Sequence, residues 1–395
     1  MKGEDMRRIS RVALLSVLAV AAASLVVGTA LGHGKPGSAP TDATWTTVFA
    51  SPVAIEGLTS DGEGNLYVPQ RGGAAGCSIV RIESQGDASQ AGVTVARINP
   101  PCNPAGLAFG PDRRLYVTGF GAAGDEIGVV SPSDADPANP PIATSFASGT
   151  PGANGVAFDD DGNLYVSDGG TAQGRVFRVG PTGGAAVVLF RVPPMANSIG
   201  VGRQNQALQP PAAGAPPTTQ GIVANGLAFG KDDVLFVADT ARGALWRVDL
   251  GERGDVRTPT GCDSTFTADT LCLDALFVQH PALDGADGIA LDRAGNVWVD
   301  ANERNAIVVV DRRGGVSEFF RNPVDASNLR NAGPLEFPTS PVITGRRLCT
   351  TNSDGNRRDN SPNSAGEASP TSAVVGKVMC LDEKLESSGE PLPVG

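Results

Sequence analysis

The chain has 395 residues, of which 51 are glycine and 30 are proline, and only 18% carry a charge. These proportions suit many short strands joined by tight turns, and no run after residue 32 shows the 3.6-residue apolar periodicity of a helix. A formal net charge of −11 excludes a nucleic-acid partner, because binding a phosphate backbone requires clustered lysine and arginine. The sequence therefore predicts an all-β protein.

The first 32 residues have the parts of an export signal: a basic head, an apolar run from Val12 to Val27, and small residues at 28–32 that suit cleavage. We predict a signal peptide at 1–32, a flexible segment at 33–43, and a secreted or otherwise extracytoplasmic protein with no further membrane contact. An uncleaved anchor is the alternative, because the apolar stretch, counted to Leu31, reaches the roughly 20 residues that span a bilayer.

From residue 44 onward one pattern recurs: an apolar stretch that begins with glycine, a turn rich in Asp and Gly, and a second apolar stretch. The clear copies are EGLTSDGEGNLYVPQ at 56–70, AGLAFGPDRRLYVTG at 105–119, NGVAFDDDGNLYVSD at 154–168, NGLAFGKDDVLFVAD at 225–239 and DGIALDRAGNVWVDA at 287–301. A weaker sixth copy, SPVITGRRLCTTN at 340–352, has Ser-Pro in place of the leading residue and glycine.

The spacing of the repeats indicates the fold. Gly57, Gly106 and Gly155 lie 49 residues apart, and repeats of about 40–50 residues with four short strands each are typical of propeller blades. We predict a six-bladed β-propeller with a central channel over residues 44–385. The ring would close by pairing TWTTVFA at 44–50 with GKVMCLDEK at 376–384 of the sixth blade, which hides both sheet edges.

Three segments fall outside the repeat. Residues 193–220, rich in Pro, Ala and Gln, are expected to be a long loop, and residues 258–281 a second loop between blades four and five. Such loops either shape a ligand site or are tolerated insertions. Residues 386–395 are expected to be a flexible C-terminal tail.

Six cysteines in an oxidising compartment indicate disulfides, and they form three local pairs along the chain. These are Cys77 with Cys102, Cys262 with Cys272, and Cys349 with Cys380. Sequence alone permits about fifteen connectivities, of which we favour local pairing, because Cys77 opens one predicted strand and Cys102 follows the next. No pair has Cys-x-x-Cys spacing, so a structural role is expected.

The residue before each leading glycine should point at the channel axis, because the innermost strands of all blades line the channel. These residues are Glu56, Ala105, Asn154, Asn225, Asp287 and Ser340. Glu56, Asn154, Asn225 and Asp287 carry oxygen donors that suit one divalent cation, with calcium favoured over magnesium, manganese or zinc. The small Ala105 and Ser340 would leave one side open for water and substrate.

A simpler interpretation of these dipeptides remains open. Asn-Gly and Asp-Gly are common turn dipeptides, so Asn154, Asn225 and Asp287 could be plain loop residues. Against this, the hairpin turn of each repeat follows about five to eight residues later along the chain, and Glu56 does not favour turns.

The second strand of each pair returns to the same end of the channel. Its last residues, Asp168, Asp239, Asn352, Gln70 and Asn302, are candidates to support the metal ligands or contact substrate, although a plain strand-end role is equally open.

Other chemistries are disfavoured. Beyond the leader and its flank only His280 remains as a histidine, and there is no G-x-S-x-G, which argues against a Ser-His-Asp hydrolase. The run DDDGN at 159–163 lacks the final Glu of a calcium loop and is expected to be a turn.

Over about residues 45–385 the sequence resembles the gluconolactonase and senescence-marker-protein (regucalcin) family of six-bladed propellers. The resemblance is specific at Glu56-Gly57, at NGLAF 225–229 and at ADGIALDRAGNVWV 286–299. It implies that Glu56, Asn225 and Asp287 hold one divalent cation, with Asn154 as a further polar residue. Members that act on sugar lactones carry Arg-x-Asn-Asp-Gly where this chain reads GANG at 152–155, which argues against a sugar lactone as substrate.

Three functions follow from these features. The first is a metal-dependent hydrolase of a lactone or related ester, with a small-molecule substrate, Asp287 as the base for the attacking water, and a monomeric chain. The second is a non-catalytic propeller that binds a ligand or a protein, with a structural metal or none. The third is a propeller lyase such as the streptogramin lyases, to which GNLYV and GNVWV are also similar, but the shortage of histidine disfavours it.

Overall fold

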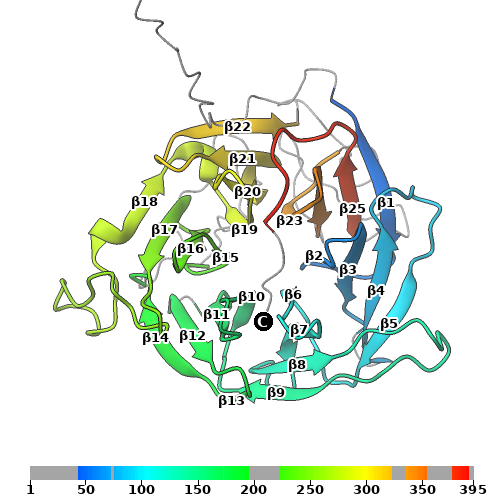
Figure 1. Cartoon of the computed structure of the whole chain (residues 1–395), viewed down its shortest axis with the longest axis horizontal. Helices are drawn as coiled ribbons and strands as arrows, with labels where there is room; N and C mark the ends of the chain where they lie inside the picture. The colour runs from blue at the N-terminus through cyan, green and yellow to red at the C-terminus, as the bar shows by residue number, and fades with distance from the viewer. Residues whose placement is uncertain are drawn as a thin grey trace, which may run out of the picture. The chain divides into compact units, whose positions relative to one another are not determined.

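The computed structural model describes residues 43–72, 75–171, 173–194, 222–322, 334–353 and 376–390, all within one unit of the chain, 35–395. The six sheets of this unit surround a central channel (Figure 1). The predicted all-β fold, a six-bladed propeller, is confirmed. The predicted signal peptide and most of segment 33–43 lie outside the described residues, in which no helix is long and apolar enough to cross a membrane.

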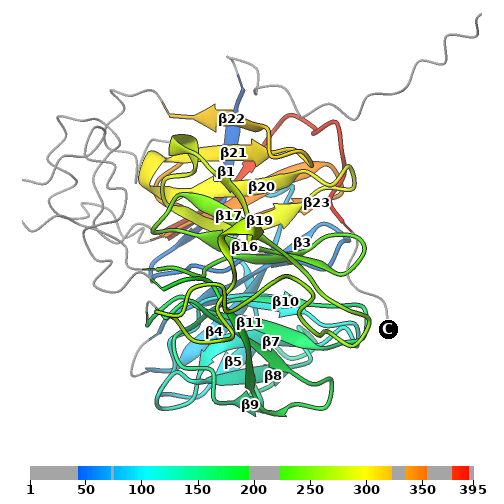
Figure 2. The same cartoon turned by 90° about the vertical axis from the view of Figure 1, so that its left-hand side faces the viewer.

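Blades one to five each have four strands in chain order, from the channel outward, as the side view of blade five shows (Figure 2). A short extra strand, β13 (Gly184–Ala185), pairs parallel with the outermost of these strands in blade two. Blade one contains β2 (Thr59–Ser60), β3 (Asn65–Gln70), β4 (Cys77–Glu83) and β5 (Val93–Ile98); blade two contains β6 (Leu107–Phe109), β7 (Leu115–Phe120), β8 (Glu126–Val130) and β9 (Thr144–Ser148); blade three contains β10 (Ala153–Phe158), β11 (Leu164–Asp168), β12 (Arg175–Val179) and β14 (Val187–Arg191). Blade four contains β15 (Leu227–Phe229), β16 (Val234–Asp239), β17 (Ala244–Asp249) and β18 (Leu276–Gln279), and blade five contains β19 (Ala286–Leu291), β20 (Val297–Ala301), β21 (Ala306–Val310) and β22 (Val316–Arg321).

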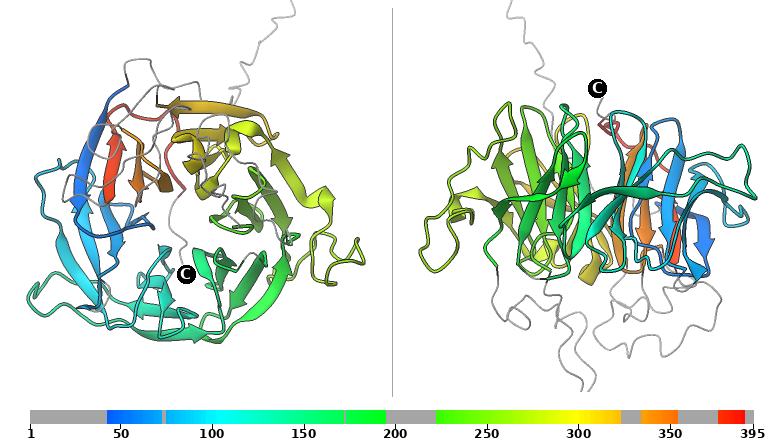
Figure 3. Two further views of the ribbon diagram at one scale, coloured as in Figure 1. Left: turned by 180° about the vertical axis from the view of Figure 1, so that it is seen from behind. Right: turned by 90° about the horizontal axis from the view of Figure 1, so that it is seen from below.

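Blade six closes the ring with both ends of the propeller. From the channel outward it contains β23 (Pro338–Thr344), β24 (Arg347–Asn352), β25 (Gly376–Leu381) and β1 (Trp45–Ser51). β1 pairs antiparallel with β25 and lies on its outer side (Figure 3). The predicted closure is therefore confirmed.

Segment 258–281, predicted to be a loop between blades, contributes a strand. Its last third contains β18, which pairs antiparallel with β17 as the outermost strand of blade four. Cys262 and Cys272 are bonded to each other in the part that precedes β18. The long spacing between repeats four and five thus reflects an insertion within blade four, between its third and fourth strands. Of the predicted loop 193–220, residues 195–220 lie outside the described part of the chain.

The leading glycines allow neighbouring blades to approach closely at the channel. A Cβ added to any of the five leading glycines would lie 2.2–2.4 Å from a backbone carbonyl oxygen of the next blade. In each case this carbonyl belongs to the ring residue of that blade, the one just before its own leading glycine or, in blade six, before the residue in its place. In three blades the glycine N–H also donates to that carbonyl, as from Gly106 to Asn154 at 3.0 Å. The repeat needs glycine here because two backbones touch, and this contact fixes the residue before each glycine at the channel.

Substitution of one leading glycine should therefore destabilise the propeller. In Gly106→Ala the new Cβ would lie 2.2 Å from the Asn154 carbonyl oxygen, so the blades must separate. We expect a loss of about 1–3 kcal/mol in the free energy of unfolding, measured by urea denaturation. Gly180→Ala is the matched control, since a Cβ there meets no atom within 4 Å. Equal stability of the two variants would contradict this packing.

The turn between the first two strands of a blade is held by one aspartate. Asp159 accepts hydrogen bonds from the Asn163 backbone N–H at 2.8 Å, from its side-chain amide at 2.8 Å, and from the Tyr165 hydroxyl at 3.0 Å. Asp292 repeats this arrangement with Asn296 and Trp298 in blade five. The DDDGN run is thus a turn, as predicted.

All three predicted disulfide pairs are present. Cys77 is bonded to Cys102, and Cys262 to Cys272. Cys349 and Cys380 are cross-strand neighbours on β24 and β25, so their bond lies within the blade that closes the ring.

Part of the predicted C-terminal tail is hydrogen-bonded to the propeller. Gly389 donates to the Gly345 carbonyl at 3.0 Å, and Ser388 accepts from the Arg293 backbone N–H at 2.8 Å. The prediction of a flexible tail from residue 386 is therefore wrong for 386–390, because these backbone groups pair with the turns of blades five and six. Residues 391–395 lie outside the described residues.

Candidate metal centre at the mouth of the channel

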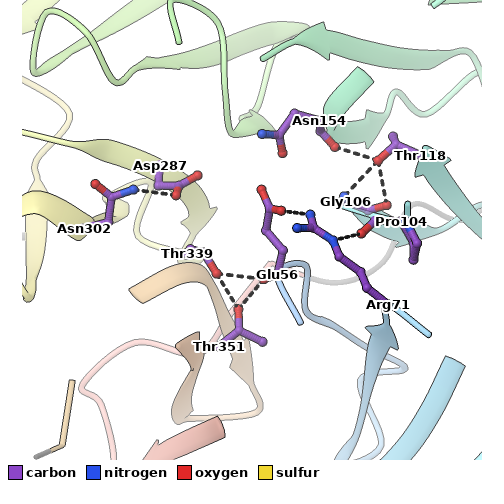
Figure 4. Close-up of polar contacts among 10 residues, drawn as sticks. All are labelled: Glu56, Arg71, Pro104, Gly106, Thr118, Asn154, Asp287, Asn302, Thr339 and Thr351. Atoms are coloured by element: carbon purple, nitrogen blue, oxygen red, sulfur yellow. Dashed lines mark hydrogen bonds and ion pairs between the residues drawn. The ribbon is translucent and has the colours of Figure 1, made fainter. Parts of the chain in front are cut away.

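Polar side chains from different blades meet at the channel mouth. Glu56, Asn154 and Asp287 lie around a common space (Figure 4), and Asn154, Asn225 and Asp287 line the channel cavity. The structure thus brings together the four predicted metal ligands. Ala105 occupies the equivalent position in blade two and is buried.

In blade six the residue at this position is Thr339, one residue before the predicted Ser340. Gly288 packs against the Thr339 carbonyl, just as each other leading glycine packs against the carbonyl of the ring residue in the next blade. Ser340 therefore stands where the other blades have their leading glycine. The Thr339 hydroxyl donates to the Glu56 carbonyl at 2.9 Å, which connects blade six to blade one. The assignment of Ser340 to the ring is therefore wrong by one residue, because the sixth copy lacks the glycine that sets the register.

Asn225 is oriented by a threonine whose hydrogen-bonding role is fixed. The Thr240 hydroxyl donates to the Ala286 carbonyl at 2.6 Å, so it can only accept from the Asn225 amide nitrogen at 3.0 Å. The Asn225 Nδ2 therefore faces Thr240. Asn225 is only 2% exposed, so this orientation is fixed inside the protein.

Asp287 is a buried carboxylate held from one side. The Asn302 amide donates to its Oδ2 at 2.7 Å. Burial is the main cause that raises the pKa of Asp287 well above its usual range, and the negative charge of Glu56 raises it further. The hydrogen bonds from Asn302 and Asn225 lower the pKa of Asp287. A cation between Asp287 and Glu56 would relieve the repulsion between their charges.

Glu56 is paired with an arginine that sequence reasoning missed. The Arg71 Nη2 forms an ion pair with Glu56 Oε2, and the Arg71 Nε donates to the Pro104 carbonyl at 2.8 Å (Figure 4). Arg71 directly follows the last residue of β3, Gln70. An arginine carries no oxygen donor, so the pattern of possible cation ligands in the sequence does not include it.

The channel is apolar next to the ring. Its cavity has a volume of about 70 Å³ and is lined next by apolar residues, one from each blade: Leu58, Leu107, Val156, Leu227, Ile289 and Pro341. This volume accommodates a cation with water, since one water takes about 30 Å³, but not a substituted lactone. A substrate must therefore contact the ring from its outer side.

Of the candidates at the second-strand ends, only Asn302 hydrogen-bonds to a ring residue. Asp168 and Asp239 pair with nearby arginines, Arg175 and Arg242, at 2.7 Å each. The other two bond to neighbouring strands and segments: Gln70 donates to Ser51 at 3.0 Å, and Asn352 accepts from the Glu336 backbone N–H at 2.6 Å. These contacts stabilise strand ends, while Asn302 orients Asp287.

Asp300, on β20, is a buried carboxyl that the sequence did not single out. The Thr350 hydroxyl donates to its Oδ2 at 2.5 Å, and its Oδ1 has no hydrogen-bond partner among the described residues. Burial raises the pKa of Asp300 well above its usual range. The folded protein therefore favours the neutral acid.

The raised pKa of Asp300 predicts how stability depends on pH. The pKa of Asp300 is higher in the folded protein than in the unfolded chain. Its contribution to the free energy of unfolding is therefore complete below about pH 4 and is lost as the pH rises through the pKa of the folded state. We expect Asp300→Asn, a neutral isostere, to be more stable than the wild type at pH 8 by about 1–3 kcal/mol, with a smaller difference at pH 5. Urea denaturation at both pH values measures this, with Asp274→Asn on the surface as control. A less stable variant at pH 8 would contradict it.

The donor set fits a hard divalent cation. Two carboxylates and two amides offer oxygen atoms from four blades, and Asn302 and Thr240 orient two of them. Among the described residues, no three or more His, Cys, Asp or Glu side chains are clustered so that they alone could hold a metal ion. A hard cation does not require such a cluster, because amide oxygens complete its coordination.

One family model matches part of the chain. Residues 216–329 match the model of the SMP-30/Gluconolactonase/LRE-like region. This range includes Asn225 and Asp287 but not Glu56 or Asn154. No curated protein matches the chain.

Several solved structures share the fold at low sequence identity. Regucalcin from Agrobacterium tumefaciens, a calcium-binding protein, has a TM-score of 0.56 at 17% identity, with 89% of this chain and 97% of that chain covered. The luciferin-regenerating enzyme has a TM-score of 0.53 at 14% identity, covering 89% and 99%. The PQQ-bound aldose sugar dehydrogenase from Streptomyces coelicolor has a TM-score of 0.52 at 16% identity, covering 87% and 99%.

These neighbours establish the fold alone, because propellers of this kind have different activities. The family resemblance stated from the sequence is confirmed by the matched region. The chain is thus a six-bladed β-propeller with an SMP-30/gluconolactonase/LRE-like region at residues 216–329.

Proposed function

We propose that this protein is an exported hydrolase of a lactone or related ester and that it depends on one divalent cation, with calcium the first choice. The observation that supports this most is the convergence of Glu56, Asn154, Asn225 and Asp287 at the mouth of the channel. The SMP-30/gluconolactonase/LRE-like region, which contains two of the four, supports the same chemistry. The chain acts as a monomer on a small-molecule substrate.

Each ring residue has a role in this proposal. Glu56, Asn154, Asn225 and Asp287 would hold the cation, which supplies a Lewis acid for the substrate carbonyl. Asp287 would act as the general base for the attacking water. Thr240 accepts a hydrogen bond from the Asn225 amide nitrogen and so holds this side chain in place.

Blades two and six contribute no cation ligand to the ring. Ala105 carries no polar group at the ring, and Thr339 directs its hydroxyl to the Glu56 carbonyl. The reacting carbonyl therefore approaches past blade two or blade six. The absence of an arginine at 152–155 favours a lactone or ester other than a sugar lactone.

Export is part of the same proposal. The three disulfides are compatible with an oxidising compartment outside the cytoplasm. The leader-like residues 1–32 support the same location. The substrate would accordingly be met outside the cytoplasm.

The test is hydrolysis of a panel of aldono-, alkyl- and aryl-lactones by the purified protein. The protein is assayed as prepared, after chelation, and after restoring calcium, manganese or zinc. We expect turnover of at least one lactone, loss of that turnover on chelation, and its recovery with a cation. Cation-loaded protein that hydrolyses nothing across the panel would contradict the proposal.

A binding propeller is the second candidate, and one observation favours it. A pocket of about 560 Å³, far larger than the channel cavity, lies between the turns of blades four and five. Phe236, Phe277 and Leu291 line it together with Lys231 and Arg312. Its size lies within the range of small-molecule sites, about 300–1,000 Å³. Binding of an apolar anion that Phe236→Ala abolishes, in a protein without lactone turnover, would favour this function.

A further inference from the structure

Arg71 brings a positive charge to a ring that is built from oxygen donors. Its Nη2 pairs with Glu56 Oε2, and its Nε donates to the Pro104 carbonyl at 2.8 Å, so the guanidinium is held from two sides (Figure 4). The side chains of Glu56 and Arg71 are 19% and 29% exposed. A partly buried pair with two fixed contacts is a defined element of the site rather than a loose surface contact.

This pair determines how Glu56 can contribute. Because Arg71 engages Oε2, the remaining oxygen, Oε1, is the one available to the ring, and Glu56 is restricted to binding a cation through a single oxygen. Arg71 also opposes cation binding through its own charge. Both effects weaken the affinity for a cation relative to a ring without the arginine.

The charges at the mouth show what Arg71 adds. Glu56 and Asp287, when both are ionised, carry two negative charges, and Arg71 carries one positive charge. A divalent cation would therefore leave the mouth with one surplus positive charge. Without Arg71 the same cation and the same two carboxylates would balance.

We infer that Arg71 makes the cation-loaded site selective for a substrate that carries a carboxylate beside its lactone or ester group. The inference rests on the proposed function. Arg71 Nη1 has no hydrogen-bond partner among the described residues, and a guanidinium binds a carboxylate through directed N–H donors. An anionic substrate balances the surplus charge, and a neutral substrate does not.

Three variants separate charge from hydrogen bonding. Arg71→Gln removes the charge and keeps an amide donor, while Arg71→Lys keeps the charge and loses the fork of donors. Arg313→Gln, on the exposed turn between β21 and β22, removes the same charge away from the ring and is the matched control.

Two measurements test the inference. The first is calcium binding to the chelated full-length protein by calorimetry, in which we expect Arg71→Gln to bind about tenfold tighter than the wild type and Arg313→Gln to be unchanged. The second is kcat/KM for 5-oxotetrahydrofuran-2-carboxylate and for its methyl ester. The wild type is expected to prefer the carboxylate by about tenfold or more, Arg71→Gln to lose that preference, and Arg71→Lys to keep part of it.

The outcomes distinguish this inference from the function beneath it. If the wild type binds calcium and hydrolyses both lactones equally well, or if Arg71→Gln changes neither affinity nor preference, the role of Arg71 is overturned and the proposed function stands. If neither the wild type nor any variant binds a cation, the proposed function fails and the inference fails with it.

Discussion

Asp287→Ala is expected to abolish cation binding and hydrolysis together. The residue supplies one of the two ring carboxylates and is the proposed base, and the other ring carboxylate, Glu56, is paired with Arg71. We expect calcium affinity to fall below detection in calorimetry and kcat/KM to fall about 10³-fold or more. Asp287→Asn should keep the hydrogen-bonded shape of the ring but lose both functions, because an amide has neither the charge nor the basicity.

The controls for this prediction address folding and charge. Asp274→Ala removes an exposed carboxylate elsewhere on blade four and should leave binding and turnover unchanged. Circular dichroism and urea denaturation establish that the Asp287 variants are folded. Hydrolysis that persisted in a folded Asp287→Ala protein would show that the ring is not the catalytic centre.

Removal of the Cys349–Cys380 disulfide should cause the largest loss of stability among the three bridges. Its sequence separation of 31 is the longest, and it lies in the blade where the N-terminal strand β1 closes the ring on β25. The loop-entropy relation gives about 3–4 kcal/mol for a loop of this length. We therefore expect Cys349→Ala/Cys380→Ala to lower the free energy of unfolding by that amount in urea denaturation without reductant.

The Cys262–Cys272 pair provides the comparison. Its separation is 10, for which the same relation gives about 2.7 kcal/mol. This pair lies in the insertion before β18, away from the closing strand. If its removal costs as much as or more than removal of Cys349–Cys380, neither loop length nor ring closure determines the contribution of these bridges.

Periodicity accounts for most of what the sequence predicted. The leading glycine recurs because each blade needs a backbone contact with the next at the channel, so aligning the glycines also aligned Glu56, Asn154, Asn225 and Asp287. The closing strand was predictable because an unpaired β1 and an unpaired third strand of blade six would each expose an edge.

The failures occurred where this pattern is interrupted. Blade six has serine in place of the leading glycine, so the ring residue was set one position late, at Ser340 rather than Thr339. β18 was hidden because an insertion separates it from β17, and a four-residue strand has too little pattern of its own. Arg71 and Asp300 were missed because their importance depends on contacts that no local pattern encodes: Arg71 pairs with Glu56 across blade one, and Asp300 bonds to Thr350 of blade six.

The most direct test of the account is to locate the cation. Crystals of the protein grown or soaked with manganese, which gives an anomalous signal, would show whether an ion binds in the channel. We expect one anomalous peak within about 2.0–2.6 Å of oxygen atoms of Glu56, Asn154, Asn225 and Asp287. Manganese-loaded crystals with no peak at this ring, or with a peak held by other residues, would contradict it.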